Sequence, residues 1–338
     1  MTLDAEVRVG VIGCGGMGAL HAGLLAGMRG VAVAATMDAD PARAAALAEA
    51  TGATTYATAE AVIEAVDAVI VASPNETHPA LVLAALKARK PVFCEKPLAL
   101  TRADAEAIVA AEVAAGRRLV QVGFMRRYDP RHRELWDLVR AGAVGWPALV
   151  RGWHHSITTG DYVMPPEHAL RSAMVHDFDS LCWLAGEAPA AVSARGALAG
   201  PVGAGWALDF LEVRWRFPSG ALATAEFHAR SDAGYAVGVE ITAGGGTLRT
   251  GASSAAVRGH GEAASSAVDL HWFMRFADAY RLQARAWADV LLGLAPGSAP
   301  SAWDGLVSLA VAEAAGRSLA AGGVEVPVEL PRRPALYN

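Results

Sequence analysis

The chain has 338 residues, of which 53% are hydrophobic and 19% are charged, and its formal net charge is -5. This composition excludes an intrinsically disordered chain and can fill two cores of ordinary size. The acidic balance and the lack of a polybasic block argue against nucleic acid or an anionic membrane surface as a partner, so we expect a small-molecule ligand.

Cysteine usage and the N-terminus indicate a cytoplasmic protein. Cys14, Cys94 and Cys182 are widely spaced and form no C-x-x-C pair, so neither disulfides nor a metal site is expected. The opening MTLDAEVRVG has no basic segment ahead of its apolar run. We find no apolar stretch that reaches the ~18 residues of a membrane-spanning helix.

The first third of the chain alternates short β-rich runs with helical patterns. Strands are expected at VRVGVIG, VAVAATM, DAVIVASP, KPVFCEKP and RLVQVGF, and helices at MGALHAGLLAGM, DPARAAALAEATG, ETHPALVLAALKAR and RADAEAIVAAEVAAG. Because these strands are apolar on both faces, the pattern predicts βαβ units around a parallel sheet. We therefore expect a doubly wound, Rossmann-type domain over residues 1–124.

A glycine-rich loop, GCGGMG, follows the first predicted strand and opens the first predicted helix. Its G-x-G-x-x-G spacing is typical of a dinucleotide site: Gly13 allows the tight turn, Gly15 admits the pyrophosphate and Gly18 permits close helix packing. We expect the whole loop to contact the cofactor, namely Gly13, Cys14, Gly15, Gly16, Met17 and Gly18.

Asp38 ends the second predicted strand and is placed to bind the adenosine ribose hydroxyls. Its carboxylate would repel a 2′-phosphate, so NAD is favoured over NADP. The alternative is a glycine-rich turn in which Asp38 only begins a helix. His21, on the helix after the glycine loop, suits packing at least as well as cofactor contact, so we leave it out of the site.

Two further loops are expected at the carboxyl edge of the parallel sheet, where open α/β sheets bind their ligands. In CEKPLA, Glu95 and Lys96 are expected to contact the cofactor, and Lys96 can also hold a substrate oxygen, although a lysine before a turn proline is often only a surface residue. The loop ASPNETH is expected to cover the nicotinamide side of the cofactor. Its candidate residues are Ser73, Pro74, Asn75 and His78, and His78 equally suits a cap or packing role.

The remainder of the chain, residues 125–338, is expected to form a second α/β domain with a large, mostly antiparallel sheet. Strands are predicted at PALVRGWHH, APAAVSARGAL, both arms of LDFLEVRWRFPSGALATAEFHAR, and YAVGVEITAGGGTLRTG. The last long helix, WDGLVSLAVAEAAGRSLAAG, is expected to pack back on the first domain. An open sheet face rich in Trp and Phe tends to be covered, which predicts a homo-oligomer, a dimer or tetramer.

These motifs resemble a known family. In order and spacing, GCGGMG, ASPNETH and CEKPLA resemble the Gfo/Idh/MocA family of NAD(P)-dependent oxidoreductases, and QVGFMRRYDP and WFMRFADAYRLQARAW resemble its inositol 2-dehydrogenase branch. The resemblance implies a Rossmann-type domain followed by an α+β domain with a large antiparallel sheet. It also implies NAD as cofactor and hydride transfer to or from a secondary ring hydroxyl of a cyclitol or sugar.

The family pattern pairs the lysine of E-K-P with a histidine, here Lys96 and His176, and has an aspartate four residues before the histidine, where this chain has Ser172. Three interpretations stay open. His176 is the base, with Asp179 supporting its charge and Ser172 binding a substrate hydroxyl; or His176 only binds substrate and Lys96 or Tyr280 carries the proton. In the third, the protein binds cofactor without turnover, as a sensor or partner subunit. A histidine on an apolar helix also suits a plain core position.

Arg127 and Tyr128 follow the VGFM run and can reach a polyol with paired donors and a phenol. The alternative is an inter-domain salt-bridge network, which is the role we expect for Arg126. His154 and His155 end a strand that is expected to face the cleft, and His155 is our candidate for substrate contact.

Two departures from the inositol pattern bear on the substrate. Ser156 and Ile157 stand where the inositol enzymes usually carry Arg-Asn, and Ser172 replaces the aspartate. The expected substrate therefore widens from myo-inositol to a modified cyclitol, an aminocyclitol or a pyranose sugar.

Overall fold

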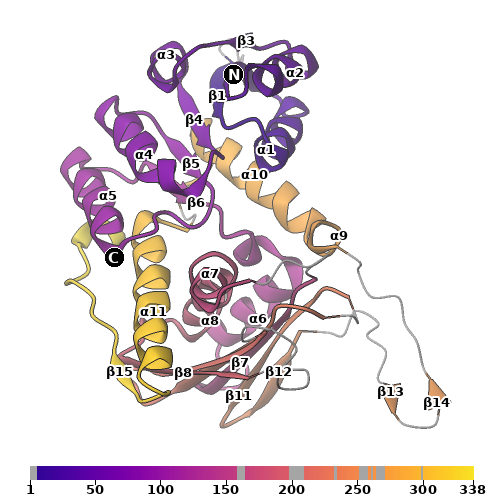
Figure 1. Ribbon diagram of the computed structural model, residues 1–338, viewed down its shortest axis with the longest axis vertical. Coiled ribbons are helices and arrows are strands. Elements are labelled where there is room, and N and C mark those ends of the chain that lie inside the picture. Colours follow the sequence, from indigo (N-terminus) through magenta and orange to yellow (C-terminus); the bar gives the residue numbers. More distant parts are fainter. Residues whose placement is uncertain are drawn as a thin grey trace. The chain divides into compact units, whose positions relative to one another are not determined.

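The computed structural model describes residues 6–157, 164–197, 209–231, 234–250, 258–259, 262–263, 271–297 and 300–338. The chain forms two units (Figure 1). Unit 1 contains Met1–Met125, Tyr280–Leu309 and Pro331–Asn338, and unit 2 contains Arg126–Ala279 and Ala310–Leu330. Both units therefore consist of segments that are separate in the sequence, whereas we expected consecutive domains over residues 1–124 and 125–338 with the last helix packing back on the first domain. The last long helix, α11 (Ala302–Ala320), is divided between the units.

Unit 1 is built on a parallel sheet of six strands in the order β3-β2-β1-β4-β5-β6. Its strands are β1 (Val7–Ile12), β2 (Val31–Met37), β3 (Thr54–Thr55), β4 (Ala68–Val71), β5 (Val92–Cys94) and β6 (Val120–Val122). The helices are α1 (Gly16–Ala26), α2 (Pro41–Thr51), α3 (Ala59–Ala65), α4 (His78–Lys87) and α5 (Arg102–Ala115), with α10 (Ala277–Leu291) added from the C-terminal part. The Rossmann-type prediction is confirmed.

Local sequence explains where the helices of unit 1 begin and end. The side chains of Asp40, Thr58 and Thr101 accept backbone N–H bonds at the starts of α2, α3 and α5. Gly52 and Gly116 end α2 and α5 with φ of 74° and 72°, a conformation that favours glycine. These caps fix the loops that join the helices to the ends of the strands.

Unit 2 contains a seven-stranded sheet in the order β12-β11-β7-β10-β9-β8-β15, in which only β7 and β10 pair in parallel among the described strands. Its strands are β7 (Pro147–His155), β8 (Ala191–Ala197), β9 (Phe210–Arg216), β10 (Leu222–His228), β11 (Ala236–Ala243), β12 (Gly246–Arg249) and β15 (Val326–Pro327), and β13 (Arg258–Gly259) pairs separately with β14 (Glu262–Ala263). The helices are α6 (Pro130–Arg140), α7 (Pro166–His168), α8 (Val175–Ala185) and α9 (Trp272–Arg275). The mostly antiparallel sheet is confirmed.

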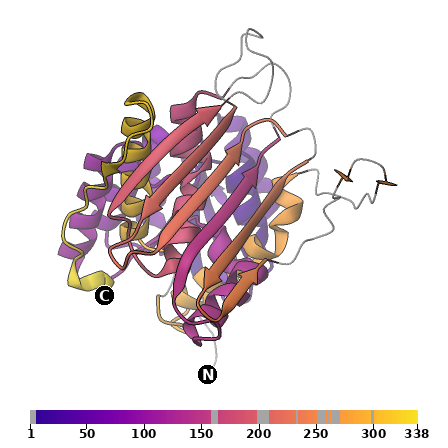
Figure 2. The ribbon, with the colours of Figure 1, turned by 90° about the horizontal axis from the view of Figure 1, so that it is seen from below.

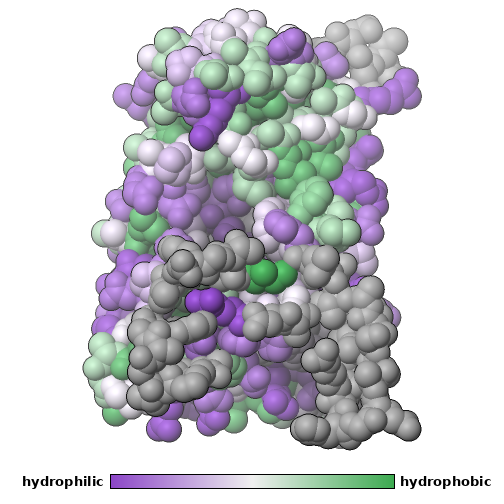
Figure 3. All heavy atoms as spheres, turned by 45° about the vertical axis from the view of Figure 1, so that its right-hand side comes forward, coloured by the Kyte–Doolittle hydropathy of each residue, from purple (hydrophilic) through white to green (hydrophobic). Residues whose placement is uncertain are grey.

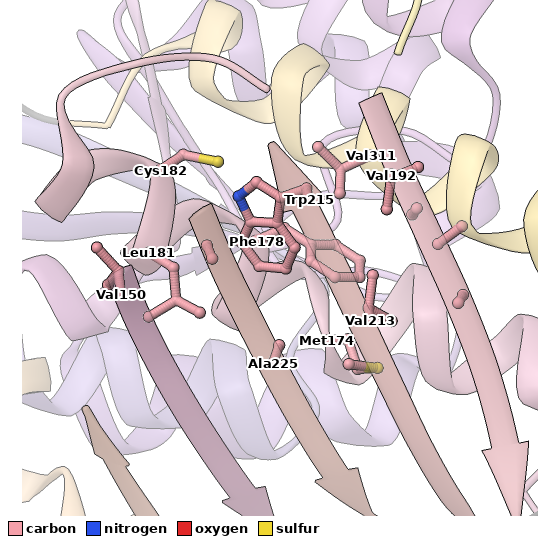
Figure 4. Close-up of a cluster of buried hydrophobic side chains, with 14 of the residues drawn as sticks. Val150, Met174, Phe178, Leu181, Cys182, Val192, Val213, Trp215, Ala225 and Val311 are labelled. Atoms are coloured by element: carbon pink, nitrogen blue, oxygen red, sulfur yellow. The ribbon is translucent and has the colours of Figure 1, made fainter. Parts of the chain in front are cut away.

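Helix α8 packs on the inner face of this sheet. Figure 4 shows Phe178 and Leu181 of α8 beside Val150 and Trp215 of the strands, and the rings of Phe178 and Trp215 meet edge to face at 5.8 Å. A Cβ on Gly152 would lie 3.0 Å from a Leu181 methyl carbon, so the glycine permits this close approach. The packing fixes the helix that carries His176.

The outer face of this sheet is the one turned to the viewer in Figure 2. It carries several arginine and glutamate residues, and Trp153 and Phe210 lie on the same face. Arg151 lies 3.7 Å from Glu226 and 3.8 Å from Glu240, and Arg216 pairs with Glu325 at 3.0 Å. A groove of about 500 Å³ runs along this face. Trp215 and Phe227 of the strands are turned inward, where they fill the core under α8.

Hydrophobic and hydrophilic side chains are interspersed on the face drawn in Figure 3. The large hydrophobic residues that stay exposed include Trp146, Met274 and Leu294. Within the described ranges, no helix combines the length and apolar character needed to cross a membrane.

Candidate active site

The glycine loop has the geometry of a dinucleotide cradle. Gly13 has φ of 93°, and a Cβ there would lie 2.4 Å from the Ser73 nitrogen; a Cβ on Gly18 would lie 1.8 Å from the Gly13 oxygen. By contrast, nothing lies within 4 Å of a Cβ on Gly15 or Gly16, at the N-terminus of α1. Open space beside free helix N–H groups fits a pyrophosphate.

Asp38 ties the end of β2 to this loop. Its Oδ2 accepts the Cys14 N–H at 2.6 Å and its Oδ1 accepts the Asp40 N–H at 2.8 Å. Asp40, not Asp38, caps α2, so Asp38 does more than begin a helix. Burial and the neighbouring Asp38 carboxylate raise the pKa of Cys14 to about 11, which keeps the thiol neutral beside the cofactor loop.

The lysine loop is organised by a buried carboxylate. Glu95 lies 2.7 Å from Nε2 of His21 and accepts the Lys96 N–H at 3.1 Å. Burial opposes ionisation of Glu95, yet the hydrogen bond from His21 and the nearby charges of His21 and Lys96 hold its pKa below the usual value. A Cβ on Gly123 would lie 3.0 Å from the carboxylate, so the glycine of the VGFM run makes room for it.

His21, which we left out of the site, packs inside unit 1 beside the lysine loop. Its ring lies 4.7 Å from Phe93 and 6.1 Å from Tyr280, so α10 brings the candidate Tyr280 beside the lysine loop. The sequence spacing indicates the buried position of His21, because it lies three residues after Gly18 and both residues are on the buried side of α1.

His78 joins the two loops at the carboxyl edge of the sheet. This buried side chain lies with Nδ1 2.8 Å from the Pro97 oxygen and Nε2 3.0 Å from the Ser73 oxygen. These two contacts fit the alternative in which His78 is a packing residue. Contact of His78 with the cofactor stays a prediction. Pro74 is exposed and Asn75 begins a short 3-10 turn, Asn75–Thr77, at the same edge.

Ser172 and His176 do not share one regular α-helix. Ser172 lies in a π-helical turn, Ala169–Ala173, closed by the Met174 N–H on the Ala169 oxygen at 2.9 Å. Helix α8 begins only at Val175, so positions 172 and 176 belong to different helical elements, and the contact expected between them stays a prediction. Such wide turns are frequent at functional sites.

A buried network fixes the residue next to His176. Nη1 of Arg126 donates to Oδ1 of Asp177 at 2.5 Å, and Nδ1 of His154 lies 2.9 Å from Oδ2 of Asp177. Burial opposes ionisation of Asp177, but Arg126 and His154 outweigh it and lower the pKa of its carboxyl group. Arg126 is an ion-pair residue, as expected, but its partners Asp177 and His154 belong to the same unit, so the expectation of an inter-domain pair is wrong for these contacts.

Arg127 forms a bidentate pair with Asp179, with Nε donating to Oδ2 at 3.0 Å and Nη2 to Oδ1 at 2.5 Å. The Arg127 side chain keeps 15% of its surface exposed, whereas Asp179 is buried. Two of the donors expected for a polyol are thus engaged by Asp179. The support of His176 by Asp179 and the substrate contact of Arg127 stay predictions.

Strand alternation separates the two histidines at the end of β7. His154 faces α8 and joins the Asp177 network, whereas His155 lies on the outer face, 6.0 Å from the ring of His228. Burial and His228 lower the pKa of His155. The structure therefore brings His154, not His155, together with α8.

The other candidate residues divide between the units. Lys96 and Tyr280 belong to unit 1, and Tyr128, Ser172 and His176 belong to unit 2. Tyr128 is half-buried at the end of the 3-10 turn Met125–Tyr128 that also carries Arg126 and Arg127.

Comparison with protein families matches both units. Residues 7–124 match the Gfo/Idh/MocA model described as an oxidoreductase family with an NAD-binding Rossmann fold, and residues 132–249 match the Gfo/Idh/MocA C-terminal domain. The chain belongs to the Gfo/Idh/MocA family. The resemblance inferred from the motifs is confirmed, and with it the assignment as an NAD-dependent oxidoreductase.

Individual relatives cover nearly the whole chain. An inositol 2-dehydrogenase of Rubrobacter xylanophilus is 41% identical over 340 residues, 99% of this chain and 97% of the relative. Inositol 2-dehydrogenase 1 of Saccharopolyspora erythraea is 41% identical over 98% of this chain and 99% of its own. The crystal structure of a Lactobacillus casei myo-inositol dehydrogenase with NAD(H) and myo-inositol has a TM-score of 0.89 at 30% identity, covering 98% of this chain and 100% of that one.

Proposed function

We propose that the protein oxidises a secondary ring hydroxyl of a cyclitol or sugar to a ketone with NAD, or runs the reverse reduction. The observation that carries this proposal is the 41% identity to an inositol 2-dehydrogenase over 99% of the chain. The open space at Gly15 and Gly16 and the buried Glu95 beneath Lys96 support it, because they suit a dinucleotide and a fixed lysine loop.

In this proposal Lys96 and His176 handle the proton. NAD supplies the hydride acceptor when it is bound. Lys96 holds the substrate oxygen and stabilises it as negative charge develops, while His176 takes the hydroxyl proton. The His21–Glu95 hydrogen bond steadies the loop that carries Lys96, and the Arg126–Asp177 pair steadies the start of α8 beside His176.

The proposed substrate is inositol-like but not restricted to myo-inositol. A serine hydroxyl at position 172 cannot carry the charge of an aspartate, although it can donate and accept a hydrogen bond to a substrate hydroxyl. A site without that carboxylate suits a substrate whose groups near position 172 differ from those of myo-inositol, such as an aminocyclitol, a modified cyclitol or a pyranose.

A panel of cyclitols and pyranoses with NAD, followed at the NADH absorbance, tests the proposal. Lys96→Met is expected to lower kcat by at least about 100-fold while NADH still binds, and exposed Lys87→Met, on α4, serves as the matched control. No turnover of any polyol by a protein that binds NADH would refute the proposal and favour a cofactor-binding protein.

We also propose that the protein is a homo-oligomer, a dimer or tetramer, that associates through the outer face of the unit 2 sheet. That face presents arginines and glutamates together with the exposed Leu222, so it can meet a second copy of itself. Light scattering should show more than one subunit, and Leu222→Glu should lower the mass while Val113→Glu, on α5, should not. Equal masses for all three proteins would exclude this face.

The cytoplasm is the location that we propose. Cys14, Cys94 and Cys182 are buried and form no disulfide, which suits a compartment that keeps thiols reduced. Fractionation of cells that produce the protein from its own gene would test this.

A further inference from the structure

A second pocket lies in unit 1 at the amino edge of the parallel sheet. Its volume is about 220 Å³, and its floor is formed by residues 119–121 at the start of β6. Trp287, Val290 and Leu291 of α10 form one wall, and Arg117 and Arg118 line the opening. The glycine and lysine loops follow the other ends of these strands, so the pocket is separate from the dinucleotide cradle.

The opening is positively charged. Helix α5 ends at Gly116, and the turn that follows leaves Arg117 and Arg118 exposed. Nη2 of Arg117 donates to the Arg89 oxygen at 3.0 Å, and Nη2 of Arg89 donates to the Ala115 oxygen at 3.3 Å. These carbonyl groups orient the two guanidinium groups without neutralising them.

None of the ion pairs found between described residues includes Arg89 or Arg117. On a chain whose formal net charge is -5, such a concentration of cations creates a local field that attracts anions.

The wall of the pocket is apolar. Trp287 is 3% exposed and packs edge to face on Phe93, with ring centroids 5.7 Å apart, so its position is fixed. Val290 and Leu291 are half-buried beside it. A bare inorganic anion would leave Val290 and Leu291 in contact with water, whereas an organic group would cover them and gain hydrophobic free energy.

We propose that this pocket binds a small organic anion, a phosphate or carboxylate joined to an apolar group. The anionic group lies between Arg117 and Arg118, whose planar guanidinium groups bind oxyanions with paired hydrogen bonds. The apolar group lies against Trp287, Val290 and Leu291. The volume of about 220 Å³ limits the ligand to roughly the size of one ring with its anionic group.

Calorimetric titration of the full-length protein, saturated with NADH to fill the dinucleotide cradle, tests the proposal. The probes are phenyl phosphate, benzoate and inorganic phosphate. We expect phenyl phosphate or benzoate to bind at one site at least about tenfold more tightly than inorganic phosphate, and the stronger of the two identifies the preferred anion.

The double variant Arg117→Ala/Arg118→Ala should weaken this binding by at least about tenfold. Arg285→Ala is the matched control, because Arg285 is exposed on α10, bonds to Asp289 and does not line the pocket. Thermal unfolding checks that both variants are folded. No binding of either organic probe, affinities equal to that of inorganic phosphate, or undiminished binding by the folded double variant would overturn the proposal.

Discussion

Ser172 is the residue that most clearly separates this chain from the inositol 2-dehydrogenase pattern. We expect Ser172→Asp to raise kcat for myo-inositol by about tenfold, because a carboxylate there would stabilise the positive charge that His176 gains with the proton. Ser172→Asn has a similar shape without the charge and is the control. Steady-state kinetics across pH provide the measurement, and equal effects of the two variants would show that charge at position 172 does not limit the reaction.

His21 carries a second prediction at the residue scale. His21→Leu removes the hydrogen-bond partner of the buried Glu95 carboxylate, and such a loss typically costs about 3 kcal/mol. Urea unfolding at neutral pH measures it. His168→Leu, at an exposed histidine of α7, should change the free energy of unfolding by less than about 0.5 kcal/mol.

The pH dependence of the His21→Leu effect follows from the lowered pKa of Glu95. A carboxyl group whose pKa is lower in the folded state adds stability above its unfolded pKa of about 4.3, and this stability is lost as the pH falls through the folded value. Without His21, burial dominates and raises the pKa of Glu95. The difference between wild type and variant should therefore be greatest near neutral pH and shrink in acid; a constant difference would contradict the assignment.

At the scale of elements, the sequence predicted the strands better than the turns. The strands of unit 1 were recognisable because they are apolar on both faces, and the β9–β10 hairpin because FPSG separates two alternating runs. The π-helical turn before α8 was missed, since it depends on one backbone hydrogen bond from Met174 to Ala169 that no residue type announces. Helices α3 and α6 were also not predicted.

The sequence pattern could have predicted which of the two histidines, His154 or His155, faces α8. Val150 and Gly152 face the core under α8, so period-two alternation puts His154 on that face and His155 on the other. By contrast, the pairings of Arg127 with Asp179 and of Arg126 with Asp177 join positions more than fifty residues apart, and one sequence gives no local signal for them.

The start of α8 carries the prediction at this scale. Arg126→Met leaves Asp177 buried without its cation and should destabilise the protein by about 3–5 kcal/mol, whereas the double variant Arg126→Met/Asp177→Leu should recover part of the loss. Arg133→Met, which breaks an exposed pair with Asp137, should cost less than about 1 kcal/mol. Urea unfolding of the wild type, Arg126→Met, Asp177→Leu and the double variant tests the pair, and a double variant as unstable as the sum of the two single variants would show no coupling.

At the scale of the whole molecule, the sequence interpretation treated the domains as consecutive segments, but the chain passes between the units at 125/126, 279/280, 309/310 and 330/331. Long-range packing explains the difference. Ala284, Trp287 and Ala288 of α10 join the core of unit 1, and the Tyr337 hydroxyl donates to Glu112 at 2.5 Å. The sequence around these residues gives no local signal that they pack against strands from the N-terminal part of the chain.

This arrangement predicts the behaviour of an incomplete chain. A nascent chain that has exposed only residues 1–279 outside the ribosome lacks α10, so the sheet face that Trp287 covers stays open. We expect protease to cut its first 125 residues readily, with no protection by NADH, and the full-length chain to resist under the same conditions. Equal resistance of both chains would show that the N-terminal segment is stable without α10.

The divided core also reverses the usual order of events during synthesis, in which N-terminal domains fold first. The glycine loop is made within the first twenty residues, yet the helix that completes the core beneath it is translated after residue 276. For most of translation, α10 has not been made and cannot cover the apolar face of the cofactor-binding sheet. The first part of the protein to leave the ribosome is therefore among the last to be finished, and its dependence on chaperones should end only when the C-terminal segment emerges.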